Sequence, residues 1–138
     1  NLGNNELTTL DGQLFQGLTQ LRDLTLAHNY IQTVPEDAFY GLVNLQYLDL
    51  QHNKITHIDN MAFALLKNLE DLNLGENMFS HLPTDGLDGL RNLKTFNNRE
   101  LKEFPSPETF PRITILTLSY AYHCCEFIKL QEQVNKMH

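Results

Sequence analysis

The chain has 138 residues, of which 41% are hydrophobic, so it is long and apolar enough for one domain with a continuous core. Its net charge of −7 disfavours a nucleic-acid partner and suits a basic protein, although acidity can also serve solubility alone. The longest apolar run, residues 61–66, is far shorter than the ~18 residues that a membrane span needs.

A phrase of regularly spaced leucines recurs along the chain, L-x-x-L-x-L-x-x-N-x-φ, in which φ is apolar. An earlier, partial copy starts at Leu2, so we expect the true start of the protein to lie upstream. In the L-x-L part, alternation along a short strand directs the leucines inward and their neighbours outward. The three full copies follow one another at a constant interval: Leu21, Leu24, Leu26, Asn29 and Ile31; Leu45, Leu48, Leu50, Asn53 and Ile55; and Leu69, Leu72, Leu74, Asn77 and Phe79.

The second half of each unit also repeats. Phe15, Phe39 and Phe63 align, and we align Leu18, Leu42, Leu66 and Leu90 in the same way. This pattern resembles the leucine-rich-repeat class, whose units have about 20–29 residues. The resemblance implies an α/β solenoid shaped like a horseshoe, with a parallel concave sheet and an irregular convex side.

The recurring asparagine stands where each strand ends and the chain turns inward. An amide side chain both donates and accepts, so it can satisfy buried backbone groups of neighbouring coils. We therefore predict that Asn29, Asn53 and Asn77 form a buried polar ladder.

The pattern weakens after residue 90. We expect Leu93 and Phe96 to begin a further unit at the same interval, with Leu101 standing where the asparagine is due. The next strand is expected to start at Ile113, after a shorter interval. Shortened terminal units are typical of the way solenoids cap their core, and we assign the repeats to residues 1–121.

Residues 122–138 are predicted to form a cysteine cap with a short amphipathic hinge helix, because Phe127, Leu130 and Val134 have helical spacing. Cys124 and Cys125 are adjacent, and Cα atoms ~3.8 Å apart disfavour a mutual disulfide. A reduced pair is possible, but we favour structural disulfides to two cysteines outside this chain, which would indicate an extracellular protein.

The outward strand positions form the candidate binding surface, on a wall of six strands about 24 Å across at ~4.8 Å per strand. Asp23, Tyr47 and Asp71 beside Asp49 combine acid with an aromatic anchor, which suits a basic partner; alternatively they are ordinary solvated strand residues. The candidate ligand-binding residues are Asp23, Thr25, Tyr47, Asp49, Gln51, Asp71 and Asn73, and the other outward positions are Ala27, Gly75, Thr95 and Asn97.

We expect no enzyme, metal or cofactor. The sequence lacks catalytic and phosphate-binding motifs. The histidines pair by repeat alignment alone, His28 with His52 and His57 with His81, whereas a metal site needs three or four convergent ligands.

The ending resembles a more specific group. Phe110-Pro111-Arg112-Ile113 leads to Tyr122-His123-Cys124-Cys125-Glu126-Phe127, and this is similar to the last repeat and hinge start of the leucine-rich-repeat-containing G-protein-coupled receptors. The segment 86–90 looks like the group of the R-spondin receptors and the insect bursicon receptor.

The resemblance implies part of a receptor ectodomain on the extracellular face of the plasma membrane, which binds a secreted cystine-knot hormone or R-spondin. It also implies that Cys124 and Cys125 pair with cysteines just before the first transmembrane helix. The alternative is a secreted or adhesion-type leucine-rich-repeat protein without a signalling portion.

Overall fold

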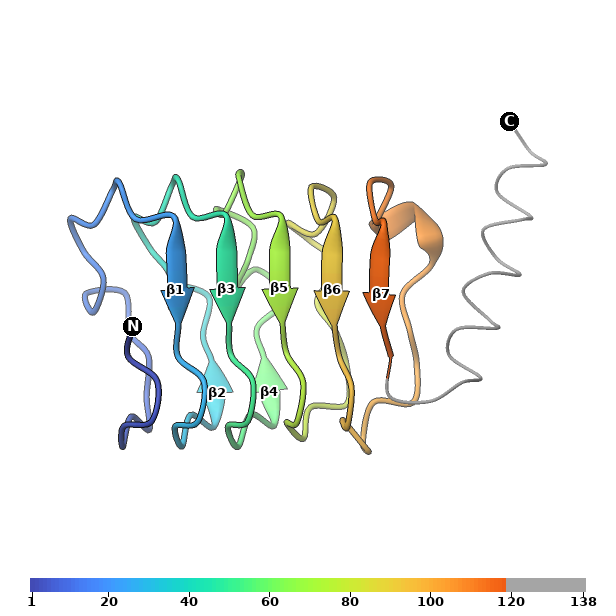
Figure 1. Ribbon diagram of the computed structural model, residues 1–138, viewed down its shortest axis with the longest axis horizontal. Helices are drawn as coiled ribbons and strands as arrows, with labels where there is room; N and C mark the ends of the chain where they lie inside the picture. Colours follow the sequence, from blue (N-terminus) through green and yellow to red (C-terminus); the bar gives the residue numbers. More distant parts are fainter. Residues whose placement is uncertain (119–138) are drawn as a thin grey trace.

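The repeated L-x-L segments form the strands of one parallel sheet. In the computed structural model, which describes residues 1–118, the sheet has the order β1-β3-β5-β6-β7 (Figure 1). Each strand pairs in parallel with the next at equivalent repeat positions, as Leu24, Leu48 and Leu72 show. The five strands are β1 (Asp23–Thr25), β3 (Tyr47–Asp49), β5 (Asp71–Asn73), β6 (Asn92–Lys94) and β7 (Ile115–Thr117).

Behind this sheet, the second half of each coil returns to the start of the next strand (Figure 1). Strand β2 (Thr33–Val34) pairs in parallel with β4 (His57–Ile58), and a short 3-10 helix, η1 (Pro107–Thr109), precedes β7. These elements confirm the predicted leucine-rich-repeat solenoid with an irregular outer side. The predicted cysteine cap and hinge helix at 122–138, with Cys124 and Cys125, lie outside the described residues.

The first, partial copy of the phrase runs beside β1 without becoming a strand. The backbone N–H groups of Leu2 and Asn4 donate to the carbonyl oxygens of Thr25 and Ala27, both at 3.0 Å. The described part of the chain therefore has a main sheet of five strands, and the prediction of six strands is wrong.

The core is built from equivalent side chains that stack from coil to coil. Leu24, Leu48 and Leu72 point inward and are at most 4% exposed. On the outer side, the rings of Phe15 and Phe39 stack with centroids 6.3 Å apart, and Phe39 and Phe63 follow at 6.1 Å. Because each layer contacts only its neighbours, cohesion of the solenoid depends on this repetition.

The predicted asparagine ladder is confirmed. Oδ1 of Asn53 accepts the N–H of Ile31 in the preceding coil at 3.1 Å, and Nδ2 donates to the carbonyls of Leu26 and Leu50, each at 3.0 Å. Asn29 and Asn77 make the same set of bonds with their own neighbours. The side chains thus satisfy backbone groups that β-pairing leaves unpaired at the turn.

The residue before each ladder asparagine turns the chain through the left-handed region. The φ angles are 58° at His28, 57° at His52 and 55° at Glu76. This conformation is uncommon for residues other than glycine, so the periodic histidines mark a backbone turn.

The alignment predicted after residue 90 is wrong. Strand β6 pairs Leu93 with Leu72, which shortens this unit, and Leu90 therefore corresponds to Leu69. The ladder asparagine of the shortened unit is Asn98, whose Oδ1 accepts the N–H of Asn77 at 3.1 Å. Leu101 is buried elsewhere in the core. The next unit is also shorter than the first ones, since β7 pairs Leu116 with Leu93.

Candidate ligand-binding face

Side chains at alternate strand positions project away from the core and form one continuous surface. We call the outward side of β1, β3, β5, β6 and β7 the sheet face. The strand register aligns its residues in two rows, because equivalent positions of parallel strands lie side by side. The first row is Asp23, Tyr47, Asp71, Asn92 and Ile115, and the second is Thr25, Asp49, Asn73, Lys94 and Thr117.

Tyr47 lies at the centre of the acidic part of the sheet face. Its side chain is 37% exposed, and its hydroxyl donates to Oδ2 of Asp49 at 3.3 Å. Partial burial raises the pKa of the Tyr47 hydroxyl above 10.0, and the negative charges of Asp49, Asp71 and Asp23 raise it further. The phenol therefore remains a neutral donor with an accessible aromatic face.

A network of hydrogen bonds holds the neighbouring polar side chains. Oδ1 of Asp49 accepts the N–H of Gln51 at 2.9 Å, and Oε1 of Gln51 accepts Nδ2 of Asn73 at 3.0 Å. Oδ1 of Asn73 in turn accepts the N–H of Gly75 at 3.0 Å. Asn73 is only 8% exposed, so it positions Gln51 rather than offering a surface of its own.

In the described part of the chain, the carboxylates of the sheet face form no ion pair with a basic side chain. Within residues 1–118, the ion pair that the structure contains joins Nδ1 of His52 to Oε2 of Glu76 at 3.8 Å, away from this face. Asp23, Asp49 and Asp71 therefore present net negative charge to solvent. Lys94 lies beside Asn73 on the next strand and makes no ion pair with any of them in the described part of the chain.

Three residues near β6, namely Asn92, Lys94 and Phe96, were not predicted to belong to the sheet face, because the constant interval of the first units was extended too far. A Cβ atom on Gly75 would overlap the ring of Phe96, so this half-buried ring covers Gly75. The signal that could have placed them is Asn98, which follows Asn77 sooner than Asn77 follows Asn53.

Three other positions expected to face outward are buried: Thr95 is fully buried, Ala27 is 8% exposed, and Gly75 lies under the ring of Phe96. Asn97 is exposed as expected, but it lies in the left-handed turn before Asn98, with a φ of 54°. The remaining candidates, from Asp23 to Asn73, lie together on β1, β3 and β5 and the turn that follows β3.

The described residues were also searched for a metal-binding group and for a membrane-spanning helix. Within residues 1–118, no group of three or more His, Cys, Asp or Glu side chains is arranged to hold a metal ion. In the same part of the chain, no helix has the length and hydropathy to cross a membrane.

Comparison with known proteins supports the repeat architecture. The family model described as Leucine rich repeat matches residues 1–55 and again residues 44–97. A solved structure described as "Crystal structure of TLR13-ssRNA13 complex" is similar over 86% of this chain, with a TM-score of 0.78 and 27% sequence identity. The match spans 18% of that protein's chain. No curated protein sequence matches.

Proposed function

We propose that this chain, which belongs to the leucine-rich-repeat family, is the ligand-binding part of a receptor ectodomain that recognises a secreted protein. Leucine-rich-repeat solenoids are typically interaction scaffolds, and their extended inner surfaces bind partners. The observation that carries the proposal is the sheet face, where three carboxylates lie around Tyr47 and form no ion pair within the described residues.

The chemistry of the sheet face favours a partner with a basic surface. An arginine side chain can form charge-assisted hydrogen bonds with Asp49 or Asp71 and stack on the ring of Tyr47. Complementary charge also accelerates the encounter of two proteins. The same negative charge is unfavourable for nucleic acid, so we do not extend the RNA ligand of the TLR13 complex to this chain.

The receptor class follows from the resemblance of residues 110–127 to leucine-rich-repeat-containing G-protein-coupled receptors. On this proposal the ligand is a cystine-knot hormone or an R-spondin, and the domain lies on the extracellular face of the plasma membrane. Cys124 and Cys125 would then form structural disulfides with cysteines nearer the membrane. The alternative, a secreted or adhesion-type module without a signalling portion, makes the same use of the sheet face.

The test combines a ligand panel with site-specific cross-linking. Purified cystine-knot hormones and R-spondins are offered to the chain carrying a photo-cross-linking residue at Thr25 on the sheet face, or at exposed Thr33 on β2 as the control. We expect one ligand to bind and to cross-link from position 25 but not from position 33. Binding by no member of the panel would contradict the ligand class, and cross-linking from position 33 alone would contradict the sheet face.

A further inference from the structure

The stack of phenylalanine rings ends where the units become shorter. The rings continue to Phe63, but the shortened unit passes from Pro83 to Leu87 without a phenylalanine. Gly86 turns this short loop with a φ of 86°, and a Cβ atom there would collide with the carbonyl of Phe63. The loop therefore lies directly on the backbone of the preceding coil.

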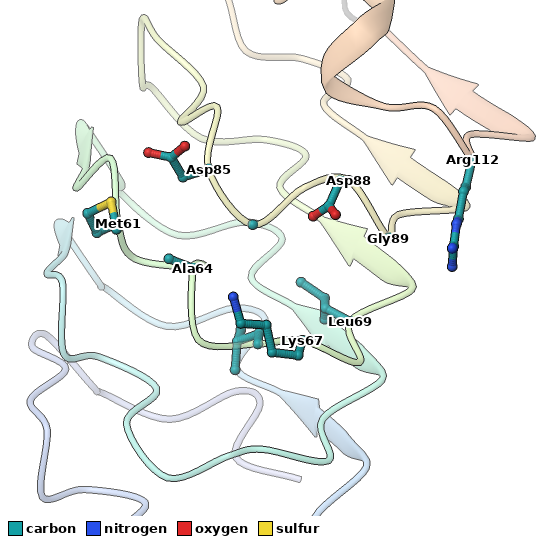
Figure 2. A pocket seen from close by; sticks show the side chains of 10 residues that line it. Met61, Ala64, Lys67, Leu69, Asp85, Asp88, Gly89 and Arg112 are labelled. Carbon is teal, nitrogen blue, oxygen red and sulfur yellow. The ribbon is translucent and has the colours of Figure 1, made fainter.

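Beside this loop the surface forms a hollow of about 500 Å³ (Figure 2). The preceding coil contributes apolar side chains, among them Met61, Ala64 and Leu69, and the short loop contributes Gly86 and Gly89. A hollow of this size can hold one or more large side chains.

The charges of the hollow are balanced. Its lining contains two carboxylates, Asp85 and Asp88, and two cations, Lys67 and Arg112. In the described part of the chain none of the four forms an ion pair. Opposite charges in equal number favour neither an acidic nor a basic side chain. The lining instead suits a neutral side chain with an apolar body and a polar tip that both donates and accepts, which describes tyrosine.

A tyrosine of this kind projects from the adjacent coil. Tyr40 is 57% exposed. It follows Phe39 in the sequence as Ala64 follows Phe63, and the rings of these two phenylalanines lie 6.1 Å apart. Tyr40 therefore occupies, one coil earlier, the position at which Ala64 lines the hollow. The chain thus presents a projecting ring and a hollow that can receive such a ring, next to each other in one row.

We propose that two copies of this chain associate through this surface, with Tyr40 of each copy in the hollow of the other. A two-fold axis brings the same surface of both copies face to face, so a self-complementary patch is required. A ring and a hollow at neighbouring positions of one row meet that requirement, with the axis between Tyr40 and Ala64. The ring contacts the apolar lining, and the hydroxyl forms hydrogen bonds with the polar lining.

The surface around this contact is apolar enough for a symmetric dimer. Val43, Met61 and Leu65 are 51%, 43% and 56% exposed. Half-exposed side chains of this size show roughly 100 Å² each, so these three and Tyr40 offer on the order of 400 Å². A homodimer interface of standard size needs about 500 Å² of apolar surface from each partner. The walls of the hollow supply the remainder.

The test is sedimentation equilibrium of the whole chain at a series of concentrations. Reducing conditions prevent intermolecular disulfides through Cys124 and Cys125. We expect a monomer–dimer equilibrium that added salt strengthens, because both copies carry a net charge of −7 and repel each other. A chain that stays monomeric at every concentration would overturn the proposal, and so would a dimer that salt weakens, since that would indicate a contact between opposite charges.

Two glutamine variants remove the two halves of the contact. Tyr40→Gln removes the ring, and Ala64→Gln narrows the hollow. Gln16 holds the equivalent position one coil before Tyr40, so the fold accepts glutamine in this row. Each variant should weaken the dimer about tenfold or more. The matched control Tyr30→Gln changes a tyrosine that is 53% exposed in the turn after β1, and it should leave the dimer unchanged.

A mixture of the two variants distinguishes this contact from unspecific association. A dimer of Tyr40→Gln with Ala64→Gln retains one intact contact, because the remaining Tyr40 meets the open hollow, whereas either variant alone retains none. With a fluorescent label on one variant, we expect more dimer in the mixture than in either variant alone. An unchanged dimer in Tyr40→Gln, or no gain on mixing, would overturn the proposal.

Thermal unfolding shows whether each variant is folded. If Ala64→Gln does not fold, the comparison of Tyr40→Gln with Tyr30→Gln decides the question. The sheet face takes no part in the contact, so the result is independent of the proposed receptor function.

Discussion

Replacement of Asn53 by alanine tests the ladder that joins the coils. Its Nδ2 bonds to Leu26 and Leu50 are partly redundant, because Asn29 also donates to the Leu26 carbonyl and Asn77 to the Leu50 carbonyl. The N–H of Ile31, by contrast, has Oδ1 of Asn53 as its acceptor, and Ile31 is fully buried. The variant therefore leaves one buried donor unpaired, which costs about 1–3 kcal/mol.

The assay is equilibrium unfolding in urea followed by circular dichroism, with Asn44→Ala as the matched control. Asn44 makes one exposed hydrogen bond, to the carbonyl of Thr19, so its loss should cost about 0.5 kcal/mol or less. We expect a lower midpoint for Asn53→Ala and nearly the parent midpoint for Asn44→Ala. An unchanged midpoint for Asn53→Ala, or equal losses in the two variants, would refute the reasoning.

Three further predictions concern the phenylalanine stack, the ionisation of Tyr47 and the packing of Phe96 on Gly75. Phe39→Ala removes the central ring of the aromatic stack, a side chain 2% exposed, and should lower the free energy of unfolding by about 3–5 kcal/mol in the same urea assay. Because the pKa of Tyr47 is raised in the folded chain, the stability it contributes is complete below pH 10.0 and is lost as the pH rises through the folded pKa; Tyr47→Phe should abolish this part of the alkaline loss in unfolding measured against pH. Gly75→Ala should displace the Phe96 ring and cost about 1–3 kcal/mol, visible as changed Phe96 ring shifts in NMR spectra.

The sequence predicted the strands and the ladder well where the repeat keeps its length. A strand of alternating leucines and an asparagine at a fixed distance determine both the inward face and the turn, so Asp23, Tyr47 and Asp71 could be placed in one row before the structure was known. Local chemistry and stacking agree in these units, which makes the pattern reliable.

The prediction failed where the repeat becomes shorter. The constant repeat interval, counted once more from Leu69, ends at Leu93, so Leu93 is the predicted counterpart of Leu69. It is a leucine, but it lies in the middle of strand β6 and pairs with Leu72. The shortened phrase begins at Leu90 and ends at Asn98, with buried Thr95 in place of its last leucine. The hollow beside Gly89 could not be predicted either, because it depends on how closely the short loop approaches the previous coil.

The most direct test of the sheet face is the salt dependence of its association with a ligand identified by the panel. The double variant Asp49→Asn, Asp71→Asn is compared with Glu36→Gln, Glu108→Gln, which makes the same change in net charge at exposed positions away from the sheet face. We predict that the aspartate variant associates about tenfold more slowly at low ionic strength and depends less on salt, whereas the control keeps the parent rate and slope. Identical rates and slopes for the parent chain and the aspartate variant would contradict recognition through the sheet face.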